Sequence, residues 1–477
     1  MKRLVLYAFV LLTGLSFSCA TDYVTGKKTF SLISESQEIA IGKEADPAIQ
    51  AEYGIYDDPA LTAYVDSIGQ SIVRVSHRPN LQYTFRIVDS PIVNAFALPG
   101  GWVYFTRGIF AHFNSEAELA GVMGHEIGHV VARHGAEQMS KAQLASIGLG
   151  IGSLVSEKFN QWSGLAETGL GLIFLSYGRN QESESDRLGV EYSTKLGYDA
   201  HKMAEFFKTI GRISDQGGQR IPTFLSTHPD PGDREANVHQ LTNEWQTQVN
   251  YRPKDISKAS YLRRIEGIVY GDDPRQGFAE NGMFYHPELR FQFPVPTNWK
   301  LQNSPAVVVM ADAEQKAMIQ FKLDNADSPQ AAASAFVTNS GATEVARAQK
   351  SVHGLPAVAL ETTLTTQSGN LRILSYFISK DNKVYVFHGY SAEANFGQYA
   401  GTLTSVMSGF DVLRNQAALS KKPDRIRIAK VRAAGTFENA ARQLSIPPDK
   451  IEQLALLNGL VAQDQVAQGD LIKILGQ

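Results

Sequence analysis

The sequence predicts an α+β protein with three parts: a mainly helical N-terminal domain that contains a short β-hairpin, an α+β domain with an antiparallel sheet, and a small βααβ C-terminal module. Three observations support this prediction. The chain has 477 residues, which is more than one ordinary domain contains. Apolar residues recur at helical spacing in the first half, whereas short β-rich runs alternate with turn residues between Met283 and about Leu413. A compact pattern of strands and helices follows Asp424.

The N-terminus has the pattern of a secretory signal. Residues 1–3 are a short basic start, and the apolar stretch from Leu4 to Leu15 has signal length but is too short to span a membrane comfortably. Cys19 is the only cysteine, so no disulfide can form within the chain. A sole cysteine after a signal core resembles the acylation site of bacterial lipoproteins. We therefore expect residues 1–19 to be a lipoprotein-type signal peptide with Cys19 as its lipid attachment site; ordinary cleavage and a retained anchor are the alternatives.

The most informative stretch is His-Glu-Ile-Gly-His at residues 125–129. Positions four apart lie on one face of a helix, so His125 and His129 can bind one metal ion together. Glu126 then lies beside the metal, where it can take a proton from a metal-bound water molecule instead of binding the metal. This pattern is typical of zinc peptidases and predicts one Zn²⁺ per chain. The alternative is a surface His/Glu pair on an ordinary helix.

The residues around this stretch favour a helix. Ser115 is a suitable N-cap, and Glu118 follows three positions later, as in a capping box. Apolar residues recur at helical spacing through the motif, and Gly135 is a plausible end of the helix. His134 lies five positions after His129, so we expect it to point away from the metal and to be structural or solvated.

Two histidines do not complete a catalytic zinc site, which takes three protein ligands and leaves one position open. A third histidine within a longer motif is ruled out, because Ala132 and Gly135 occupy the positions that would be glycine and histidine. The remaining class takes a glutamate from a later helix. Glu182 and Asp186 are four apart and share a face, so Glu182 can complete the site while Asp186 accepts a hydrogen bond from a ligating imidazole. Glu184 would point away from the zinc.

These motifs together resemble the gluzincin family of CAAX-prenyl-protease-like and heat-shock membrane peptidases, and in particular its periplasmic lipoprotein branch. Further stretches agree with that family: Asn94–Gly101 followed by Val103–Gly108, Asp186–Gly189, and Ser226–Pro229 followed by Arg234. The resemblance covers about residues 22–250 and implies a zincin-like peptidase domain whose cleft has a β-hairpin at its rim. It implies a zinc endopeptidase that acts on unfolded or misassembled envelope proteins, with Asn94, Ala95, Phe96 and Arg234 at the substrate rim.

The family match also places His228 near the metal. It could stabilise the oxyanion of the reaction, or it could occupy the water position and hold the enzyme latent. Our hypothesis for the resting state is the second, because a fourth protein ligand removes the nucleophile until substrate displaces it. The rim hairpin could pair with an extended peptide by strand addition, or it could be a plain buried strand pair.

Three ranges follow the peptidase domain. We expect a linker at 251–280 and an α+β accessory domain at 281–415. Residues 424–477 resemble a LysM domain, a small βααβ module that often binds peptidoglycan. Peptidoglycan binding and a purely structural role are the two alternatives for this module.

The net charge of the chain and its expected location indicate which binding partners it can have. A net charge of −3 and a pI near 6.4 give no reason to expect nucleic acid. The lipoprotein resemblance implies a periplasmic chain anchored to the membrane by lipid, with the outer membrane favoured because Ala20 rather than Asp follows the cysteine. The sequence thus predicts a zinc endopeptidase for envelope protein quality control; the alternative is a largely non-enzymatic assembly factor or chaperone with a latent zinc site. A cell-wall hydrolase is a third and weaker reading, which only the C-terminal module suggests.

Overall fold

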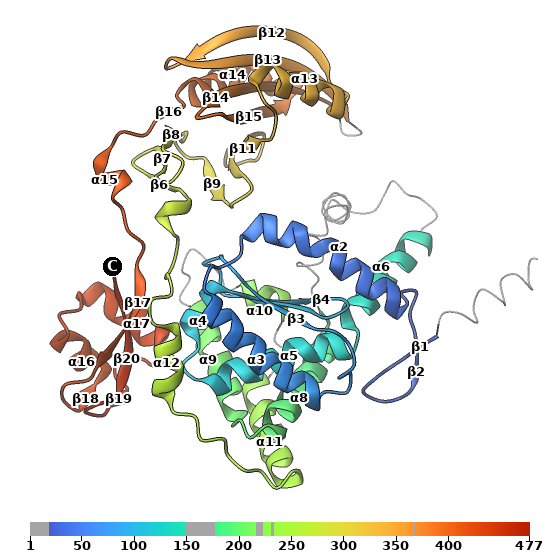
Figure 1. Cartoon of the computed structure of the whole chain (residues 1–477), viewed down its shortest axis with the longest axis vertical. Helices are drawn as coiled ribbons and strands as arrows, with labels where there is room; N and C mark the ends of the chain where they lie inside the picture. Colours follow the sequence, from blue (N-terminus) through green and yellow to red (C-terminus); the bar gives the residue numbers. More distant parts are fainter. Residues whose placement is uncertain (1–18, 149–176, 216–222, 230–232, 367–368) are drawn as a thin grey trace, which may run out of the picture. The chain divides into compact units, whose positions relative to one another are not determined.

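The computed structural model describes residues 19–148, 177–215, 223–229, 233–366 and 369–477 (Figure 1). The predicted signal segment lies outside these residues except for Cys19, with which the short strand β1 (Cys19–Thr21) begins. Helices and largely antiparallel strands occur in the same chain, which confirms the α+β class.

The chain divides into two compact units. Unit 1 combines Met1–Gln50 and Gly54–Gly271 with the C-terminal stretch Asp424–Gln477, and unit 2 consists mainly of Asp272–Pro423. Unit 2 is therefore inserted into the sequence of unit 1. The C-terminal module belongs with the region that carries the His-Glu-Ile-Gly-His motif, although unit 2 separates them in the sequence.

A three-stranded sheet lies in the N-terminal part of unit 1, with the order β3-β5-β4. Strand β3 (Thr84–Val88) runs parallel to β5 (Trp102–Thr106), and β4 (Ala95–Leu98) pairs with β5 antiparallel. Strands β4 and β5 correspond to the predicted hairpin. Gly100 and Gly101 connect them with φ values of 81° and 105°, which glycine adopts without steric cost. Among the described residues, β4 pairs with β5 alone and forms an edge of the sheet.

The described helices of this region begin and end as follows: α2 (Glu35–Tyr53), α3 (Pro59–Val75), α4 (Arg107–His112), α5 (Glu116–Val131), α6 (His134–Gly148), α8 (Arg179–Lys195), α9 (His201–Asp215), α10 (Thr223–Thr227), α11 (Arg234–Gln248) and α12 (Lys258–Ile265). Helix α5 begins as the sequence predicts: the Ser115 side chain accepts a hydrogen bond from the Glu118 amide. The Glu118 carboxylate accepts one from the Asn114 amide at 2.7 Å.

Helix α12 lies within the range 251–280, which we expected to be a linker. Tyr261, Leu262 and Ile265 of this helix are fully buried, and the Tyr261 hydroxyl donates a hydrogen bond to the Phe110 carbonyl oxygen at 3.2 Å. The apolar spacing in this short helix buries one side of it against unit 1. This part of the range is therefore packed structure, and the linker prediction fails there.

The C-terminal module has a strand-helix-helix-strand order. Its outer strands β17 (Arg425–Lys430) and β20 (Leu471–Gly476) pair antiparallel, and α16 (Phe437–Gln443) and α17 (Ile451–Leu457) lie between them in the sequence. The short strands β18 (Gly435–Thr436) and β19 (Gln465–Val466) form a second ladder. Buried residues of the module share one hydrophobic core with buried residues of the N-terminal part of unit 1. The module is thus packed as a part of that unit.

Unit 2 contains an antiparallel sheet of seven strands in the order β12-β13-β14-β15-β11-β10-β9. These strands are β9 (Lys300–Asn303), β10 (Val308–Ala311), β11 (Ala317–Asp324), β12 (Thr343–Val352), β13 (Leu355–Thr366), β14 (Gly369–Lys380) and β15 (Lys383–Ala392). Helix α13 (Pro329–Ser340) packs against β13 and β14, and α14 (Glu393–Ser408) packs against β14 and β15. A smaller sheet has the order β16-β8-β7-β6, from β6 (Phe278–Glu280), β7 (Met283–His286), β8 (Phe291–Pro294) and β16 (Asp411–Val412). The short β-rich runs of the sequence therefore form antiparallel strands.

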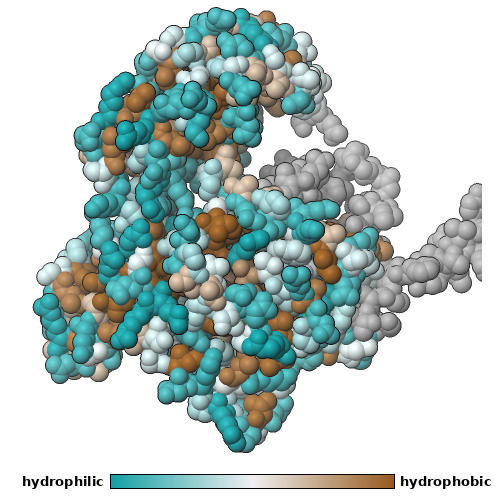
Figure 2. All heavy atoms as spheres, viewed as in Figure 1, coloured by the Kyte–Doolittle hydropathy of each residue, from teal (hydrophilic) through white to brown (hydrophobic). Residues whose placement is uncertain are grey.

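The surface is mostly polar on the face shown in Figure 2, where hydrophobic residues are separated by hydrophilic ones. The large hydrophobic residues that are exposed in the described part of the chain are Ile39, Ile55, Leu323 and Val345. Of the helices in the described ranges, none combines the length and the apolar character needed to cross a membrane.

Candidate metal centre

Four side chains from separate parts of unit 1 meet at one point: His125, His129, Glu182 and His228. Helix α5 supplies the first two, α8 supplies Glu182, and His228 follows α10. One potential ligand atom of each residue lies within 4.8 Å of those of the other three. Each residue is at most 1% exposed. Four buried polar side chains at this spacing, without apolar groups between them, form a candidate metal-binding cluster.

The distances between these atoms fit a tetrahedral metal ion. Nε2 of His125 lies 3.0 Å from Nε2 of His129 and 3.2 Å from Nδ1 of His228. Oε1 of Glu182 lies 3.4 Å from Nε2 of His129 and 3.2 Å from Nδ1 of His228. Zinc binds such atoms at about 2.0–2.1 Å in tetrahedral geometry, which places the ligand atoms roughly 3.3 Å apart. The imidazole and carboxylate donors are also of the kind that zinc takes in peptidases. The residues present therefore fit a zinc ion.

Helices α5 and α8 approach closely because glycines face each other between them. A Cβ atom on Gly124 would lie 3.0 Å from the Cα of Gly189, and one on Gly128 would lie 3.3 Å from the Cα of Ser185. Both distances are shorter than ordinary carbon contacts. The short side chain of Glu182 can reach the two histidines only because the helix axes lie this close.

Asp186 orients His125. Its Oδ1 lies 2.8 Å from Nδ1 of His125, so the imidazole donates from Nδ1 and presents Nε2 to the other ligand atoms. Arg234 donates to both oxygens of this carboxylate, at 2.6 Å and 2.8 Å. Burial raises the pKa of Asp186, but the positive charge of Arg234 and the bond to His125 outweigh it, and the net pKa is lowered. Asp186 is thus an ionised acceptor that fixes the ring of His125.

The position of Arg234 differs from our expectation. It was predicted at the substrate rim, but its side chain is 4% exposed and lies behind the ligand cluster on Asp186. Its guanidinium also lies 3.7 Å from the centre of the Phe207 ring. The rim assignment of Arg234 is therefore wrong, because the α11 N-terminus is packed against α8.

His134 also differs from our expectation. It does not point away: its Nδ1 lies 2.9 Å from Nδ1 of His129, and it is 2% exposed. Helix α5 ends at Val131, and Arg133 has a φ of 60°, so the chain turns before α6 begins at His134. An angle counted along one continuous helix therefore does not apply to this residue.

The contacts of His134 orient the second histidine ligand. If Nε2 of His129 faces the metal, its Nδ1–H donates to Nδ1 of His134, and Nε2–H of His134 donates to Glu184 at 3.3 Å. Glu184 is not in the ligand cluster, as the helical spacing predicted, but it ends this hydrogen-bonded chain. Tyr177 stacks on His129 with ring centres 3.9 Å apart. The sequence analysis placed His134 away from the metal because it assumed one continuous helix, and it did not single out Tyr177, which precedes α8.

Glu126 differs from the surrounding acids. It is fully buried, and neither of its carboxylate oxygens has a hydrogen-bond partner among the described residues. The nearest cation-forming group is His228, whose Nε2 lies 3.5 Å from Oε1. Burial raises the pKa of Glu126, and nearby His228 and His125 partly oppose this rise. A buried carboxylate with open acceptor sites beside a metal site is suited to accept a proton.

The predicted rim residues lie on or beside β4. The Asn94 side chain accepts a hydrogen bond from the Thr227 hydroxyl at 3.4 Å, which connects the start of β4 to the residue before His228. Phe96 stacks on Tyr104 with ring centres 4.9 Å apart, and Ala95 is fully buried. The structure thus brings Asn94 to the His228 segment, whereas the side chains of Ala95 and Phe96 are packed.

Known proteins resemble the part of the chain that builds this cluster. Residues 59–242 match the model of the family described as Peptidase family M48. This range contains the four residues of the cluster as well as Glu126, Asp186 and Arg234. The match therefore covers the residues on which the expected resemblance to zinc metallopeptidases rests.

Three curated relatives are similar to part of this chain. The chain is 34% identical over 253 residues to a putative beta-barrel assembly-enhancing protease of Vibrio cholerae, which covers 50% of this chain and 51% of the relative. It is 30% identical to the beta-barrel assembly-enhancing protease of Escherichia coli, over 50% of each chain. It is 32% identical to the mitochondrial metalloendopeptidase OMA1 of Arabidopsis thaliana, over 41% of this chain and 38% of the relative. The chain spans about half the length of the first two relatives.

Proposed function

From the match of residues 59–242 to Peptidase family M48, we propose that this protein is a zinc-dependent endopeptidase of the cell envelope that acts on unfolded or misassembled proteins. One observation carries the proposal: Glu126, with both oxygens open, lies beside a buried cluster of three histidines and one glutamate. A site that only stabilised the fold would have no use for a buried carboxylate without hydrogen-bond partners, because burying one is costly.

Each residue of the site has its own role in the proposed reaction. His125, His129 and Glu182 hold the metal, and Asp186 and His134 fix the two imidazole rings with Nε2 toward it. A bound zinc ion would polarise the scissile carbonyl and acidify the attacking water. Glu126 accepts the proton of that water and then passes it to the leaving amine. Its raised pKa favours the first of these transfers, since a more basic carboxylate accepts a proton more readily.

His228 makes the resting enzyme latent in this proposal. Its Nδ1 is 3.2 Å from both His125 Nε2 and Glu182 Oε1, so it occupies the fourth corner of the tetrahedron. A fourth protein ligand is a feature of closed structural zinc sites, whereas catalytic sites leave this position to water. Withdrawal of His228 would therefore admit both water and substrate to Glu126.

The edge of β4 is suited to pair with an extended substrate peptide. Since β4 pairs with β5 alone among the described strands, its other side can accept main-chain hydrogen bonds from a peptide. Recognition through the backbone tolerates many side chains and requires that the peptide be unfolded. We propose this edge as the binding site for unfolded or misassembled envelope proteins. A plain buried strand pair is the alternative, and the burial of Ala95 and Phe96 is compatible with both.

The N-terminal sequence indicates the location that we propose for the protein. The basic start, the apolar core and the sole cysteine support a lipid anchor at Cys19 on the periplasmic side of a membrane, with the outer membrane favoured. For the C-terminal module, peptidoglycan binding and a structural role both remain proposals.

The decisive experiment is cleavage of casein, or of an unfolded outer-membrane protein, by the purified chain and by Glu126→Gln, with zinc content determined for both. Cleavage by the wild type alone, with equal zinc in both proteins, would establish a metallopeptidase that uses Glu126 as base. Glu244→Gln is a control, because Glu244 is exposed on α11 and lies outside the cluster. Cleavage by Glu126→Gln at the wild-type rate would overturn the proposal.

A largely non-enzymatic assembly factor or chaperone is the second candidate. The observation that favours it is the fourth ligand, because three histidines and one glutamate can saturate a tetrahedral ion. Zinc-loaded wild type and zinc-loaded His228→Ala would then both fail to cleave unfolded protein. Cleavage by either of them excludes this candidate.

A further inference from the structure

A lysine of the C-terminal module is buried in the N-terminal part of unit 1. Lys473 on β20 is fully buried, and its ammonium group donates hydrogen bonds to the carbonyl oxygens of Ala111 at 2.6 Å and Phe113 at 2.9 Å. Ala111 is in the last turn of α4, and Phe113 follows that helix, three residues before α5 begins at Glu116. A fully buried lysine is rare, because its charge must be compensated by polar partners.

The peptide group between Phe113 and Asn114 is held from both sides. Lys473 binds its carbonyl oxygen, and the carboxylate of Glu118 accepts a hydrogen bond from its N–H at 2.7 Å. The carbonyl and the N–H of a trans peptide point in opposite directions, so the cation and the anion bind opposite edges of one plane. Hydrogen bonds with a charged partner are about twice as strong as neutral ones. The two charges therefore fix the orientation of this peptide group.

The module in turn fixes Lys473. Asn458, which follows α17, accepts a hydrogen bond from the Lys473 amide at 2.7 Å and donates to the Lys473 carbonyl at 2.9 Å. The next residue, Gly459, lies against Asn114: a Cβ atom at Gly459 would be 3.1 Å from Nδ2 of Asn114. The lysine therefore reaches α4 from a rigid support and not from a flexible loop.

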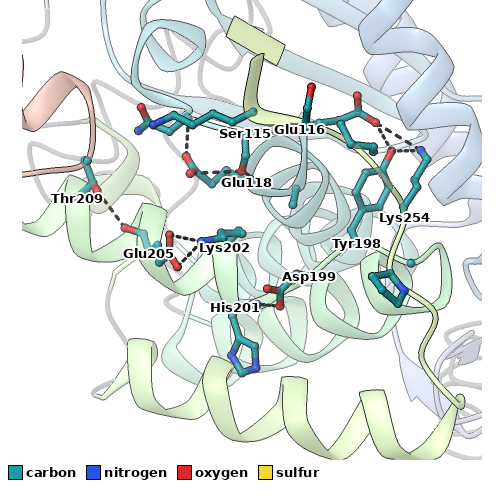
Figure 3. Close-up of a pocket in the computed structure, with 18 of the residues that line it drawn as sticks. Ser115, Glu116, Glu118, Tyr198, Asp199, His201, Lys202, Glu205, Thr209 and Lys254 are labelled. Carbon is teal, nitrogen blue, oxygen red and sulfur yellow. Dashed lines mark hydrogen bonds and ion pairs between the residues drawn. The ribbon is translucent and has the colours of Figure 1, made fainter. Parts of the chain in front are cut away.

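The held peptide group leads directly into the helix that carries the metal ligands. Glu118 is seven positions, about two helical turns, before His125 and lies on the same side of α5. Glu118 lines a pocket of about 630 Å³. Figure 3 shows it beside Ser115, with Lys202 and Glu205 of α9 nearby. Residues of the module, Asn458–Leu460, line the same pocket. The first turn of α5 and the C-terminal module thus line one pocket.

Burial disfavours the charge of Lys473 and that of Glu118, and each charge partly opposes the pKa shift of the other residue. Burial lowers the pKa of Lys473 well below its usual range, and the charge of Glu118 opposes this shift. Burial raises the pKa of Glu118 to about 7, and the bond to the Asn114 amide and the charge of Lys473 oppose this rise. Each charge therefore makes the burial of the other less costly.

We propose that Lys473 is a positioning residue for the metal site: the C-terminal module, through this one side chain, fixes the turn between α4 and α5 and so the position of His125 and Glu126. The inference rests on the proposed function for its catalytic consequence. The alternative is that Lys473 only attaches the module to unit 1 and leaves α5 unchanged.

The test compares Lys473→Met with Lys430→Met in the full chain. Lys430 is exposed and lies on β17 opposite Leu471, so its replacement changes the same module without touching α4. Three quantities are measured: the affinity for Zn²⁺ by competition with a chromogenic chelator, hydrogen exchange of residues 112–118, and kcat and KM on casein. Circular dichroism verifies that each variant is folded at the assay temperature.

We expect Lys473→Met to raise hydrogen exchange in residues 112–118, to weaken Zn²⁺ binding about tenfold or more, and to lower kcat more than it raises KM. Lys430→Met should match the wild type. An increase in exchange confined to residues 424–477, with unchanged Zn²⁺ affinity, would overturn the inference. If the wild type does not cleave casein, the proposed function fails, while Zn²⁺ affinity and exchange still decide this inference.

Glu118→Gln tests the same contact from the other side and serves if Lys473→Met does not fold. Glutamine keeps an acceptor for the Asn114 amide but removes the charge that faces Lys473. We expect hydrogen exchange to rise in β20, on the opposite side of the contact. Unchanged exchange in β20 would contradict a coupling between the module and α5.

Discussion

Gly189 lies so close to His125 that a Cβ atom on the glycine would be 2.9 Å from the amide nitrogen of the histidine. This glycine is on the helix that supplies Glu182, and the histidine is on the helix that supplies the other two expected ligands. The distance between these two backbones therefore sets the distance between the ligands.

Gly189→Ala should push the two helices apart. Overpacking of this kind costs about 1–3 kcal/mol, and the shift also moves Glu182 away from the histidines. We expect a lower free energy of unfolding and a weaker affinity for Zn²⁺, measured by urea denaturation and by chelator competition.

Gly211→Ala is the matched control, because Gly211 is also in a helix but a Cβ atom there would have no neighbour within 4 Å. It should leave Zn²⁺ affinity unchanged and stabilise the protein by about 0.5–1 kcal/mol. Equal Zn²⁺ affinity in both glycine variants would show that the close approach is not needed for the site.

Asp186→Asn should weaken metal binding while the fold is retained. The asparagine side chain cannot offer the charged acceptor that holds His125, and loss of such a partner typically lowers metal affinity about 10–100-fold. Zn²⁺ affinity by chelator competition is the measurement. Glu126→Gln changes another carboxylate of the same site that holds no imidazole, and it should keep the wild-type affinity.

His228→Ala should raise the rate of casein cleavage, because it removes the side chain that occupies the fourth corner of the cluster. The assay compares initial rates at equal zinc content. Lost activity with retained zinc would instead assign His228 to stabilisation of the oxyanion, the role that we considered second.

His112 should make the protein less stable in mild acid. Burial, with a smaller contribution from Lys473, lowers the pKa of His112 from 6.5 to about 3 in the folded chain. The unfolded chain then binds a proton below about pH 6.5 that the folded chain does not, so stability falls as the pH falls. Between pH 7 and pH 5 this residue alone should remove about 2 kcal/mol of stability.

The measurement is the free energy of unfolding of wild type and His112→Leu at both pH values, after removal of metal with a chelator. Protonation of the metal ligands then contributes equally to both proteins. The variant should lose about 2 kcal/mol less than the wild type over this interval. An identical loss in both would show that His112 is accessible to protons in the folded state.

The parts of the site that lie within one helix could be predicted from the sequence. The spacing of His125 and His129, and that of Glu182 and Asp186, follows from the geometry of an α-helix. The structure brings His125, His129 and Glu182 to one point, with Asp186 on His125. Helical spacing needs no knowledge of the rest of the fold.

The contacts that depend on a turn or on packing could not be predicted in this way. The break at Arg133 redirects His134 toward His129, and the packing of α11 on α8 buries Arg234 on Asp186. Lys473 gave no signal at all, because nothing in its neighbourhood distinguishes it from an exposed lysine on a strand. In each case the partner lies in another element, and a pattern within one element carries no information about it.

The insertion of unit 2 has a consequence for the order of synthesis. The chain is made from its N-terminus, so all four residues of the metal cluster are made before unit 2, and Lys473 is made only after it. If Lys473 fixes the turn before α5, a partly made chain holds the ligands without the contact that positions them. Full Zn²⁺ affinity would then appear only after the inserted unit has been made.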